Sequence, residues 1–216
     1  LFFTFPEFPL RLEHNFVAYA FCPMTIQELR RYLRKTRRHL SKFEQRQSAQ
    51  KVLNRLIRSP EFIHAQRIGL YLHAFGEIQT QAIIERCFKL GKQVYLPAIC
   101  DMNQQLVWIR ITQHQYHNKR FAHHRLGMRE PMSTRGVHVS KLDLLLMPLL
   151  ACDTSGTRIG MGGGFYDRTL ASAPGRPFRL GLAHDFQLLA QPLKRETWDQ
   201  PLDALITPTV FIKFKR

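Results

Sequence analysis

The chain has 216 residues, and its hydrophobic share of 44% is ordinary for a globular protein with one sizeable core. Its 32 lysine and arginine side chains against 16 acidic ones give a formal net charge of +16, which attracts anionic ligands. No apolar run reaches the roughly 18 residues of a membrane span, and the four cysteines form no CxxC pair, which disfavours a membrane protein and a zinc or disulfide scaffold. We expect a cytoplasmic protein with reduced thiols and no membrane partner.

The chain opens with a segment that differs from the rest. Residues 1–23 are rich in Phe and Pro and lack the basic and apolar regions of a secretion signal. A regular helical pattern begins only after Met24. We therefore expect residues 1–23 to be an extension and residues 24–216 to form a single α/β domain.

Two helices are expected next. In residues 25–40, Leu29, Leu33 and Leu40 fall on one side, and six basic residues cover the remainder. Ser41 and Glu44 then have the spacing of a capping box, which predicts a second helix that stops at Ser59-Pro60.

Strands and helices alternate in the remaining chain. Residues 82–90 have a helical pattern that ends at Gly91, and residues 114–139 look irregular. The expected strands are residues 67–72, 93–99, 106–111, 142–149, 179–183 and 204–207. Residues 142–149 are almost wholly apolar, as expected of a strand that is covered on both faces. This alternation predicts an α/β fold with a mainly parallel sheet, against which the N-terminal helices pack.

A glycine-rich stretch, residues 156–164, follows the apolar strand and precedes a helix expected at 165–171. Glycine lets backbone N–H groups approach phosphate oxygens, Arg158 can pair with a phosphate, and Asp167 offers an oxygen ligand to Mg²⁺. The stretch lacks the Lys-Ser/Thr end of a P-loop and the distant acidic residue of a dinucleotide site. A turn that merely packs a helix on a strand is the structural alternative. The residues alone therefore predict a phosphate- or nucleotide-binding loop beside a possible Mg²⁺ carboxylate.

The string RIGMGGGFYD at residues 158–167 resembles the signature of the 5-formyltetrahydrofolate cyclo-ligase family, usually R-L-G-x-G-x-G-[YF]-Y-D. Four further landmarks follow the family's order: the segment at 76–80, Gly91-Lys92, Leu142-Asp143 and Trp198-Asp199. The resemblance implies a three-layer α/β/α sandwich. It also implies an ATP- and Mg²⁺-dependent conversion of 5-formyltetrahydrofolate to 5,10-methenyltetrahydrofolate, in which the formyl oxygen is phosphorylated and N10 attacks.

The resemblance also assigns site residues. It implies catalytic roles for Arg158 and Tyr166, and metal binding by Asp167 and Asp199. The residues of the signature implied to contact ATP are Arg158, Ile159, Gly160, Met161, Gly162, Gly163, Gly164, Phe165 and Tyr166. A basic pair on the first helix is implied to reach the phosphates; it is Arg30 with Arg34 or Arg34 with Arg38, and these three share a helical face.

The folate side of the site is implied by resemblance as well. Glu77 matches the carboxylate that contacts the pterin, and Leu72 matches an apolar position of the folate pocket. The signature residues implied to face the substrate are Met161, Gly162, Gly163, Gly164 and Phe165. Without the resemblance, Glu77 and Asp199 read as ordinary surface-loop acids. The expected partner is 5-formyltetrahydrofolate, with or without a polyglutamate tail, and the expected state is a monomer with no obligatory nucleic acid.

Other features leave alternatives open. The histidines at 114, 117, 123 and 124 are expected in a surface loop, with metal ligation or contact with a polyglutamate tail as the alternatives. Trp108 is expected in the core, with stacking on folate as the alternative. The charge of +16 also allows a basic RNA-binding protein, and the glycine-rich loop allows a different small-molecule kinase or ligase.

Overall fold

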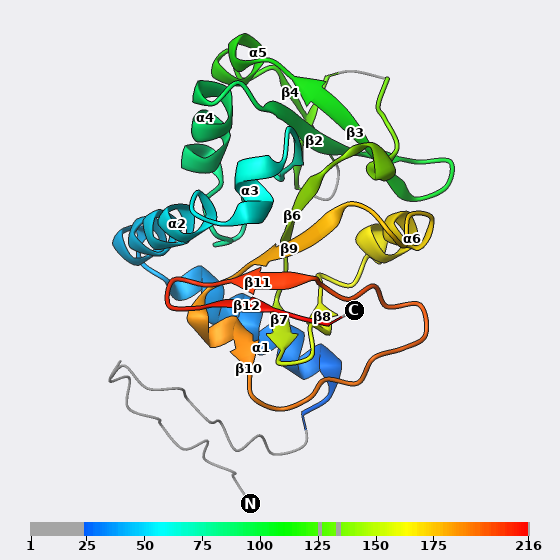
Figure 1. The fold of residues 1–216 in the computed structure, drawn as a ribbon. Helices are drawn as coiled ribbons and strands as arrows, with labels where there is room; N and C mark the ends of the chain where they lie inside the picture. Colours follow the sequence, from blue (N-terminus) through cyan, green and yellow to red (C-terminus); the bar gives the residue numbers. More distant parts are fainter. Residues whose placement is uncertain (1–23, 125–126, 133–134, 216) are drawn as a thin grey trace, which may run out of the picture.

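The computed structural model describes residues 24–124, 127–132 and 135–215, so the extension predicted for residues 1–23 lies outside the described residues (Figure 1). The helices are α1 (Ile26–His39), α2 (Lys42–Leu56), α3 (Pro60–His64), α4 (Gln81–Lys89), α5 (Gln113–His117) and α6 (Phe165–Ala171), with short 3₁₀ helices η1 (Val139–Lys141) and η2 (Asp185–Gln187). Within the described ranges, no helix combines the length and apolarity needed to cross a bilayer.

One large sheet organises the molecule. Its seven strands run in the order β12 (Phe211–Lys213), β11 (Ala204–Ile206), β9 (Phe178–Leu182), β6 (Leu144–Pro148), β1 (Arg67–Gly69), β2 (Gln93–Cys100) and β3 (Gln105–Ile111). The five inner strands are parallel, and the two edge strands β12 and β3 are antiparallel to their neighbours. Because the inner strands are parallel, the chain leaves them all at one edge of the sheet.

Helices cover both faces of this sheet, as Figure 1 shows. On one face α2, α3 and α4 pack on the strands through buried side chains that include Leu56, Phe62 and Ile84. On the other face lie α6 and η1, with Leu170, Val139 and the fully buried Trp108. The predicted α/β/α sandwich with a mainly parallel sheet is therefore confirmed, as is the prediction that Trp108 belongs to the core.

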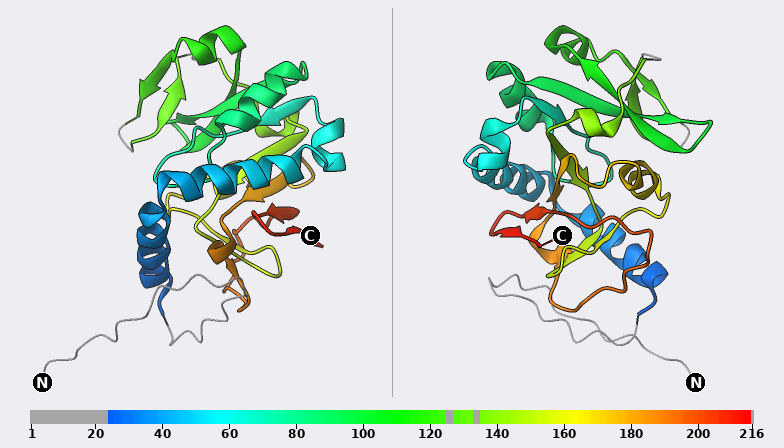
Figure 2. Two further views of the ribbon diagram at one scale, coloured as in Figure 1. Left: turned by 90° about the vertical axis from the view of Figure 1, so that its left-hand side faces the viewer. Right: turned by 45° about the vertical axis from the view of Figure 1, so that its right-hand side comes forward.

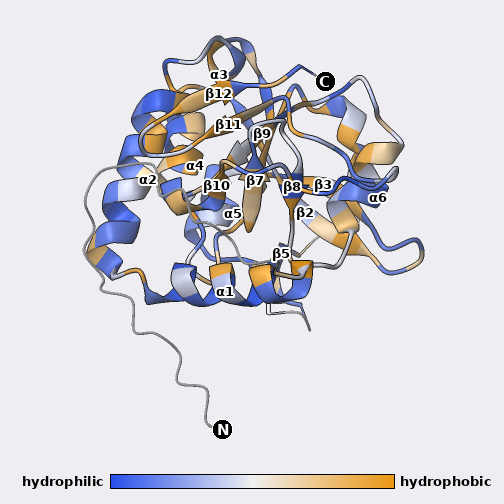
Figure 3. Ribbon diagram, turned by 90° about the horizontal axis from the view of Figure 1, so that it is seen from below, coloured by the Kyte–Doolittle hydropathy of each residue, from blue (hydrophilic) through white to orange (hydrophobic). Residues whose placement is uncertain are grey.

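A second, smaller sheet lies at the edge where the parallel strands end. It contains β10 (Leu188–Leu189), β7 (Ala151–Asp153) and β8 (Arg158–Ile159) in that order. Helix α1 packs on it through Leu29 and Leu33. Figure 2 shows α1 running in a different direction from α2, and Figure 3 shows apolar and polar residues alternating along α1.

The N-terminal helices begin where local sequence signals place them. Thr25 with Glu28, and Ser41 with Glu44, each form a complete capping box, in which side chains and backbone N–H groups satisfy one another. The capping box predicted at Ser41 is thus confirmed. The second helix ends earlier than predicted, at Leu56, and Ser59 caps the separate helix α3.

Two expectations about the middle of the chain are wrong. The stretch 114–139 is not irregular throughout, because it contains most of α5, the hairpin of β4 (Phe121–His123) and β5 (Arg129–Pro131), and the first residue of η1. These elements are too short to produce a visible period. The glycine-rich stretch 156–164 is also not a single loop directly after the apolar strand, since β7 intervenes and Arg158 and Ile159 of the stretch form β8.

Candidate active site

The glycine-rich loop runs from Gly160 to Gly164, between β8 and α6. Gly164 occupies the N-cap position of α6 with φ of 66°, a left-handed conformation that favours glycine. A Cβ added there would lie 2.7 Å from Nη1 of Arg168, whose guanidinium donates to the carbonyl of Gly163 at 2.6 Å. The glycines therefore allow a tight turn, and the Arg168 side chain packs against the backbone of that turn.

Arg158 is the buried cation of this loop. Only 4% of its side chain is exposed, and its Nη2 donates to Oδ1 of Asp167 at 2.6 Å. The guanidinium carbon lies 5.7 Å from the centre of the Tyr166 ring. Nε is buried and has no hydrogen-bond partner among the described residues. A buried donor without a partner is costly, so an acceptor that reached this atom would relieve that cost.

Asp167 and Asp199, the two carboxylates predicted to bind a metal, belong to segments that contact each other. Oδ1 of Asp167 accepts a hydrogen bond from the backbone N–H of Gln200 at 3.1 Å, which brings the residue after Asp199 next to the loop. Asp199 accepts from the N–H of Glu196 at 2.8 Å. No group of three His, Cys, Asp or Glu side chains suited to a metal occurs within the described ranges. Two hard carboxylates nevertheless match what Mg²⁺ takes from a protein when phosphates complete its shell.

Helix α1 brings arginines to the same loop. Arg30 donates through Nε to the carbonyl of Gly160 at 3.1 Å. Arg34 is half-buried, and its Nε is buried with no hydrogen-bond partner in the described part of the chain. Arg38 is exposed, and its guanidinium lies 5.4 Å from the ring centre of Phe75. Of the three predicted arginines, Arg30 therefore contacts the glycine-rich loop, whereas Arg38 contacts the loop that carries Glu77.

Glu77 lies in that second loop, which follows β1. Its carboxylate accepts from the N–H of Ala74 at 3.0 Å, and 11% of the side chain is exposed. Burial raises the pKa of Glu77 above its ordinary value, against the opposing effects of Arg37 and the Ala74 N–H. Burial and then the charge of Glu77 raise the pKa of Tyr166, so this phenol stays neutral and can donate a hydrogen bond.

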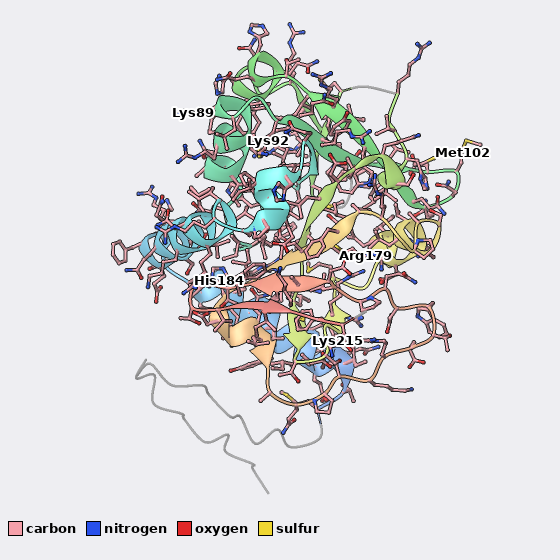
Figure 4. All side chains as sticks on the ribbon, in the orientation of Figure 1. Lys89, Lys92, Met102, Arg179, His184 and Lys215 are labelled. Carbon is pink, nitrogen blue, oxygen red and sulfur yellow. The ribbon has the colours of Figure 1, made fainter. Side chains whose placement is uncertain are left out.

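Three parallel strands end beside the Glu77 loop. The segments after β1, β6 and β9 carry the Glu77 loop, Leu149 and His184 respectively. His184, labelled in Figure 4, has Nε2 3.0 Å from the carbonyl of Gly76, and its ring stacks on Phe186. Burial lowers the pKa of His184 to about 4. The neutral ring must therefore carry its proton on Nε2, because a carbonyl can only accept.

The sequence profile of the 5-formyltetrahydrofolate cyclo-ligase family matches residues 24–208. The chain belongs to this family. The 5-formyltetrahydrofolate cyclo-ligase of Escherichia coli (strain K12) is 37% identical over 182 residues, covering 82% of this chain and 97% of the relative. The protein of the same name from Haemophilus influenzae is 35% identical over 180 residues, covering 82% and 94%.

Solved structures agree with the family assignment. The NMR structure of 5,10-methenyltetrahydrofolate synthetase from Aquifex aeolicus matches with a TM-score of 0.76 at 28% identity, covering 89% of this chain and 94% of that one. A 5,10-methenyltetrahydrofolate synthetase from Mycoplasma pneumoniae matches with a TM-score of 0.68 over 86% and 99%, and at 21% identity it supports the fold alone. The family resemblance predicted from the signature is confirmed.

The remaining predicted site residues take different positions. Ile159 is buried against α1, Met161 and the loop glycines Gly162 and Gly163 are exposed, and Phe165 is half-buried on the core. Leu72 is half-buried and packs against the core on the side of α2 to α4. The histidines at 123 and 124 line an open hollow of about 420 Å³ together with Asp101 and Gln104. His117 instead lies 2.9 Å from the carboxylate of Glu85.

Sequence reasoning missed one residue at the centre of the site, Arg37. It is 1% exposed, and its guanidinium lies between the Glu77 loop and Met161 of the glycine-rich loop. The signal was present in the helical period. At 3.6 residues per turn, Arg37 lies about 20° around the helix from Arg30, whereas Arg38 lies about 80° away.

Proposed function

We propose that the chain uses ATP to convert 5-formyltetrahydrofolate into 5,10-methenyltetrahydrofolate, with release of ADP and phosphate. Membership of the 5-formyltetrahydrofolate cyclo-ligase family supports the folate substrate. The observation that carries the nucleotide half is the buried Arg158, whose Nε lacks a partner beside the glycine-rich loop. A phosphate oxygen would satisfy this donor.

The proposed reaction has two steps. The formyl oxygen attacks the γ-phosphorus of ATP, the bond to the bridging oxygen breaks, and ADP leaves. N10 then attacks the activated carbon and loses its proton, the carbon–oxygen bond breaks, and phosphate carries the former formyl oxygen away. Both steps need alignment and neutralisation of negative charge more than covalent help from the protein.

The basic side chains suit that need. In this proposal Arg158, Arg34 and Arg30 neutralise the phosphates, and backbone groups of residues 159–166 surround them. Arg158 is buried and acts in a low-dielectric setting, where its charge stabilises a phosphate more strongly than it would in water, whereas Arg34 and Arg30 are half-buried. Arg38 is assigned a weaker, peripheral contribution, because it is exposed and lies on Phe75.

The Glu77 loop is proposed to recognise the folate. A carboxylate accepts hydrogen bonds from ring N–H and amino groups, which a reduced pterin offers. Leu72, Met161 and Phe165 add apolar surface, and Tyr166 donates from a neutral phenol. We assign catalytic roles to Arg158 and Tyr166 because the Arg158 guanidinium lies 5.7 Å from the centre of the Tyr166 ring, and Tyr166 is also close enough to Glu77 for that charge to raise its pKa. The proposed substrates would meet at these two side chains.

Asp167 and Asp199 are proposed to hold Mg²⁺ together with phosphate oxygens. The ion supplies positive charge that neutralises the phosphates when it is bound. Asp167 is already oriented by Arg158 and by the N–H of Gln200, so its carboxylate is positioned before any ligand arrives.

The wider predictions complete this proposal. We propose that residues 24–216 form one catalytic domain, that residues 1–23 are not needed for turnover, and that the protein acts as a monomer in the cytoplasm. Removal of residues 1–23 should leave kcat unchanged, and size-exclusion chromatography with light scattering should give the mass of one chain. The hollow beside His123 and His124 is the proposed contact for a polyglutamate tail.

The deciding experiment is an absorbance assay at the methenyltetrahydrofolate band, with purified protein, Mg·ATP and 5-formyltetrahydrofolate. An ATP-dependent rise is expected, and no rise from folded protein would refute the proposed function. Arg158→Met and Asp167→Asn should each reduce kcat/KM by about 100-fold or more, since each removes charge stabilisation at the transferred phosphate. Arg86→Met, an exposed change on α4, is the matched control and should retain full activity.

A further inference from the structure

Arg37 joins three segments that are far apart in the chain. Its Nε donates to the carbonyl of Phe75 at 3.0 Å, and its Nη1 donates to the carbonyl of Leu149 at 3.1 Å. Its Nη2 lies 3.7 Å from Oε1 of Glu77 and 3.8 Å from the sulfur of Met161. One side chain from α1 thus contacts the Glu77 loop, the end of β6 and the glycine-rich loop.

Burial of this charge requires those partners. Arg37 is 1% exposed, and a buried guanidinium is costly unless hydrogen bonds and an opposite charge compensate it. Burial lowers the pKa of Arg37, and the charge of Glu77 opposes that effect. The planar fork of arginine can reach three directions at once, whereas a lysine ammonium in the same place is a compact point charge.

The backbone of Arg37 is held against the same loop. A Cβ added to Gly76 would lie 2.4 Å from the carbonyl oxygen of Arg37, so the loop passes directly over α1. The carbonyl of Gly76 meets Nε2 of His184 on its other side at 3.0 Å. The Glu77 loop is therefore clamped between α1 and the segment after β9.

We propose that Arg37 is a positioning residue that holds the Glu77 loop against the glycine-rich loop and keeps Glu77 in its ionised, substrate-accepting form. This inference rests on the proposed function, because it assigns the folate to Glu77 and the nucleotide to the glycine-rich loop. Arg37 does not itself contact the reacting atoms. It sets the distance at which the two substrates meet.

The charges around Glu77 favour this role. Three titratable groups from three elements surround its carboxylate: Arg37 from α1, Tyr71 after β1 and Tyr166 from α6. Burial and the charge of Glu77 raise the pKa of Tyr71 above its ordinary value. Arg37 is the one cation among these three groups, since a tyrosine side chain is either neutral or anionic, and it opposes the rise that burial causes in the pKa of Glu77.

The test compares four variants of the full chain by steady-state kinetics. Arg37→Met removes the cation but keeps an apolar stem, Arg37→Lys keeps the charge without the fork, and Gly76→Ala displaces the loop without changing charge. Arg31→Met is the matched control, because Arg31 is exposed on the same helix. For each folded variant, KM for folate, KM for ATP, kcat and the pH profile are measured.

Arg37→Met should raise KM for folate by about 10- to 100-fold, the effect of losing a hydrogen-bonded charge. The acid limb of kcat/KM for folate should move to higher pH by about one pH unit, because the cation that favours ionised Glu77 is gone. In Arg37→Lys the acid limb should lie where it does in the wild type, but KM for folate should stay raised. In Gly76→Ala KM for folate should also rise, and the acid limb should not move. Nucleotide affinity without folate should stay close to that of Arg31→Met.

A purely structural Arg37 would behave differently. If Arg37→Met lowered only the thermal midpoint, with KM and acid limb as in Arg31→Met, the inference would be wrong while the proposed function stood. If Arg37→Met does not fold, Arg37→Lys and Gly76→Ala decide: normal KM for folate in both would overturn the inference. A folded wild-type protein without turnover would refute the proposed function itself and the inference with it.

Discussion

Replacing Asp153 by asparagine changes one oxygen to an amide nitrogen in the turn that joins β7 to β8. The carboxylate is fully buried and accepts four hydrogen bonds. Oδ1 accepts from the N–H and hydroxyl of Ser155 and from the N–H of Thr157, at 2.8 to 2.9 Å. Oδ2 accepts from the N–H of Leu193 at 2.8 Å, and Leu193 begins the segment that leads to Asp199.

The expected cost follows from that geometry. An asparagine can keep the three bonds at Oδ1, but its NH₂ group then faces the N–H of Leu193, so one charge-assisted bond is lost and two donors are opposed. Hydrogen bonds to charged groups contribute about 1.5–3 kcal/mol each, so Asp153→Asn should lower the free energy of unfolding by about 2–3 kcal/mol at pH 7. Asp101→Asn is the control, because Asp101 is exposed in the β2–β3 turn, and it should change stability by less than about 0.5 kcal/mol.

The pH dependence supplies a second readout. Burial acts to raise the pKa of Asp153, but the hydrogen bonds from Leu193, Ser155 and Thr157 together outweigh it, so the pKa is lowered. A carboxyl with a lowered folded-state pKa stabilises the fold above its unfolded pKa of about 3.9 and loses that contribution as the pH falls through its folded value. Urea denaturation should therefore show the full difference between wild type and Asp153→Asn at pH 7 and a shrinking difference below about pH 4. Equal stability at pH 7 would refute the reasoning.

Three further predictions concern other buried groups. Lys92→Met should lower the free energy of unfolding by about 2 kcal/mol in urea titrations, because its ammonium donates to the carbonyls of residues 63 and 65 at 2.9 and 2.6 Å; no change would contradict this. Burial raises the pKa of Cys87 to about 12, so its thiol stays protonated at pH 8. In a Cys22→Ser variant, a thiol reagent at pH 8 should therefore modify the half-buried Cys100 before Cys87. Rapid labelling of Cys87 in the native protein would contradict this prediction. Asp143→Asn should lower the free energy of unfolding by about 1 kcal/mol, because the Asp143 carboxylate accepts a hydrogen bond from the backbone N–H of Arg67 at 2.8 Å. Thermal melts of this variant, with Asp101→Asn as the control, test the prediction.

The parts of the fold that the sequence predicted are those with local or long-range periodic signals. Ser41 and Glu44 are three residues apart and satisfy each other without help from the remainder of the chain, so the start of α2 was predictable. The apolar run at residues 142–149 predicted a strand that is covered on both faces, and residues 144–147 are indeed fully buried. By contrast β8 has two residues, and its pairing with β7 depends on a turn that Asp153 organises, so no period could reveal it.

The site divides in the same way. The glycine-rich string is contiguous, so its resemblance to the family could be recognised residue by residue. The arginine register on α1 depends on how that helix is rotated against β7 and β8, which Leu29 and Leu33 decide by packing there. A spacing of four placed Arg30, Arg34 and Arg38 together, but a spacing of seven is the closer match to one side of a helix. The packed helix buries Arg37 and leaves Arg38 exposed.

The location of the Glu77 loop follows from strand order and not from any motif. Strands β9, β6 and β1 are neighbours and parallel, so the segments that follow them must emerge side by side at one edge of the sheet. Leu149, Gly76 and His184 belong to those three segments, and Arg37 and His184 hold them together. A change of strand order would separate these contacts even if every signature residue were kept. In the proposed function the glycine-rich loop binds the nucleotide through its own residues, but its position next to Glu77 depends on the whole sheet and on Arg37, the buried arginine that contacts both loops.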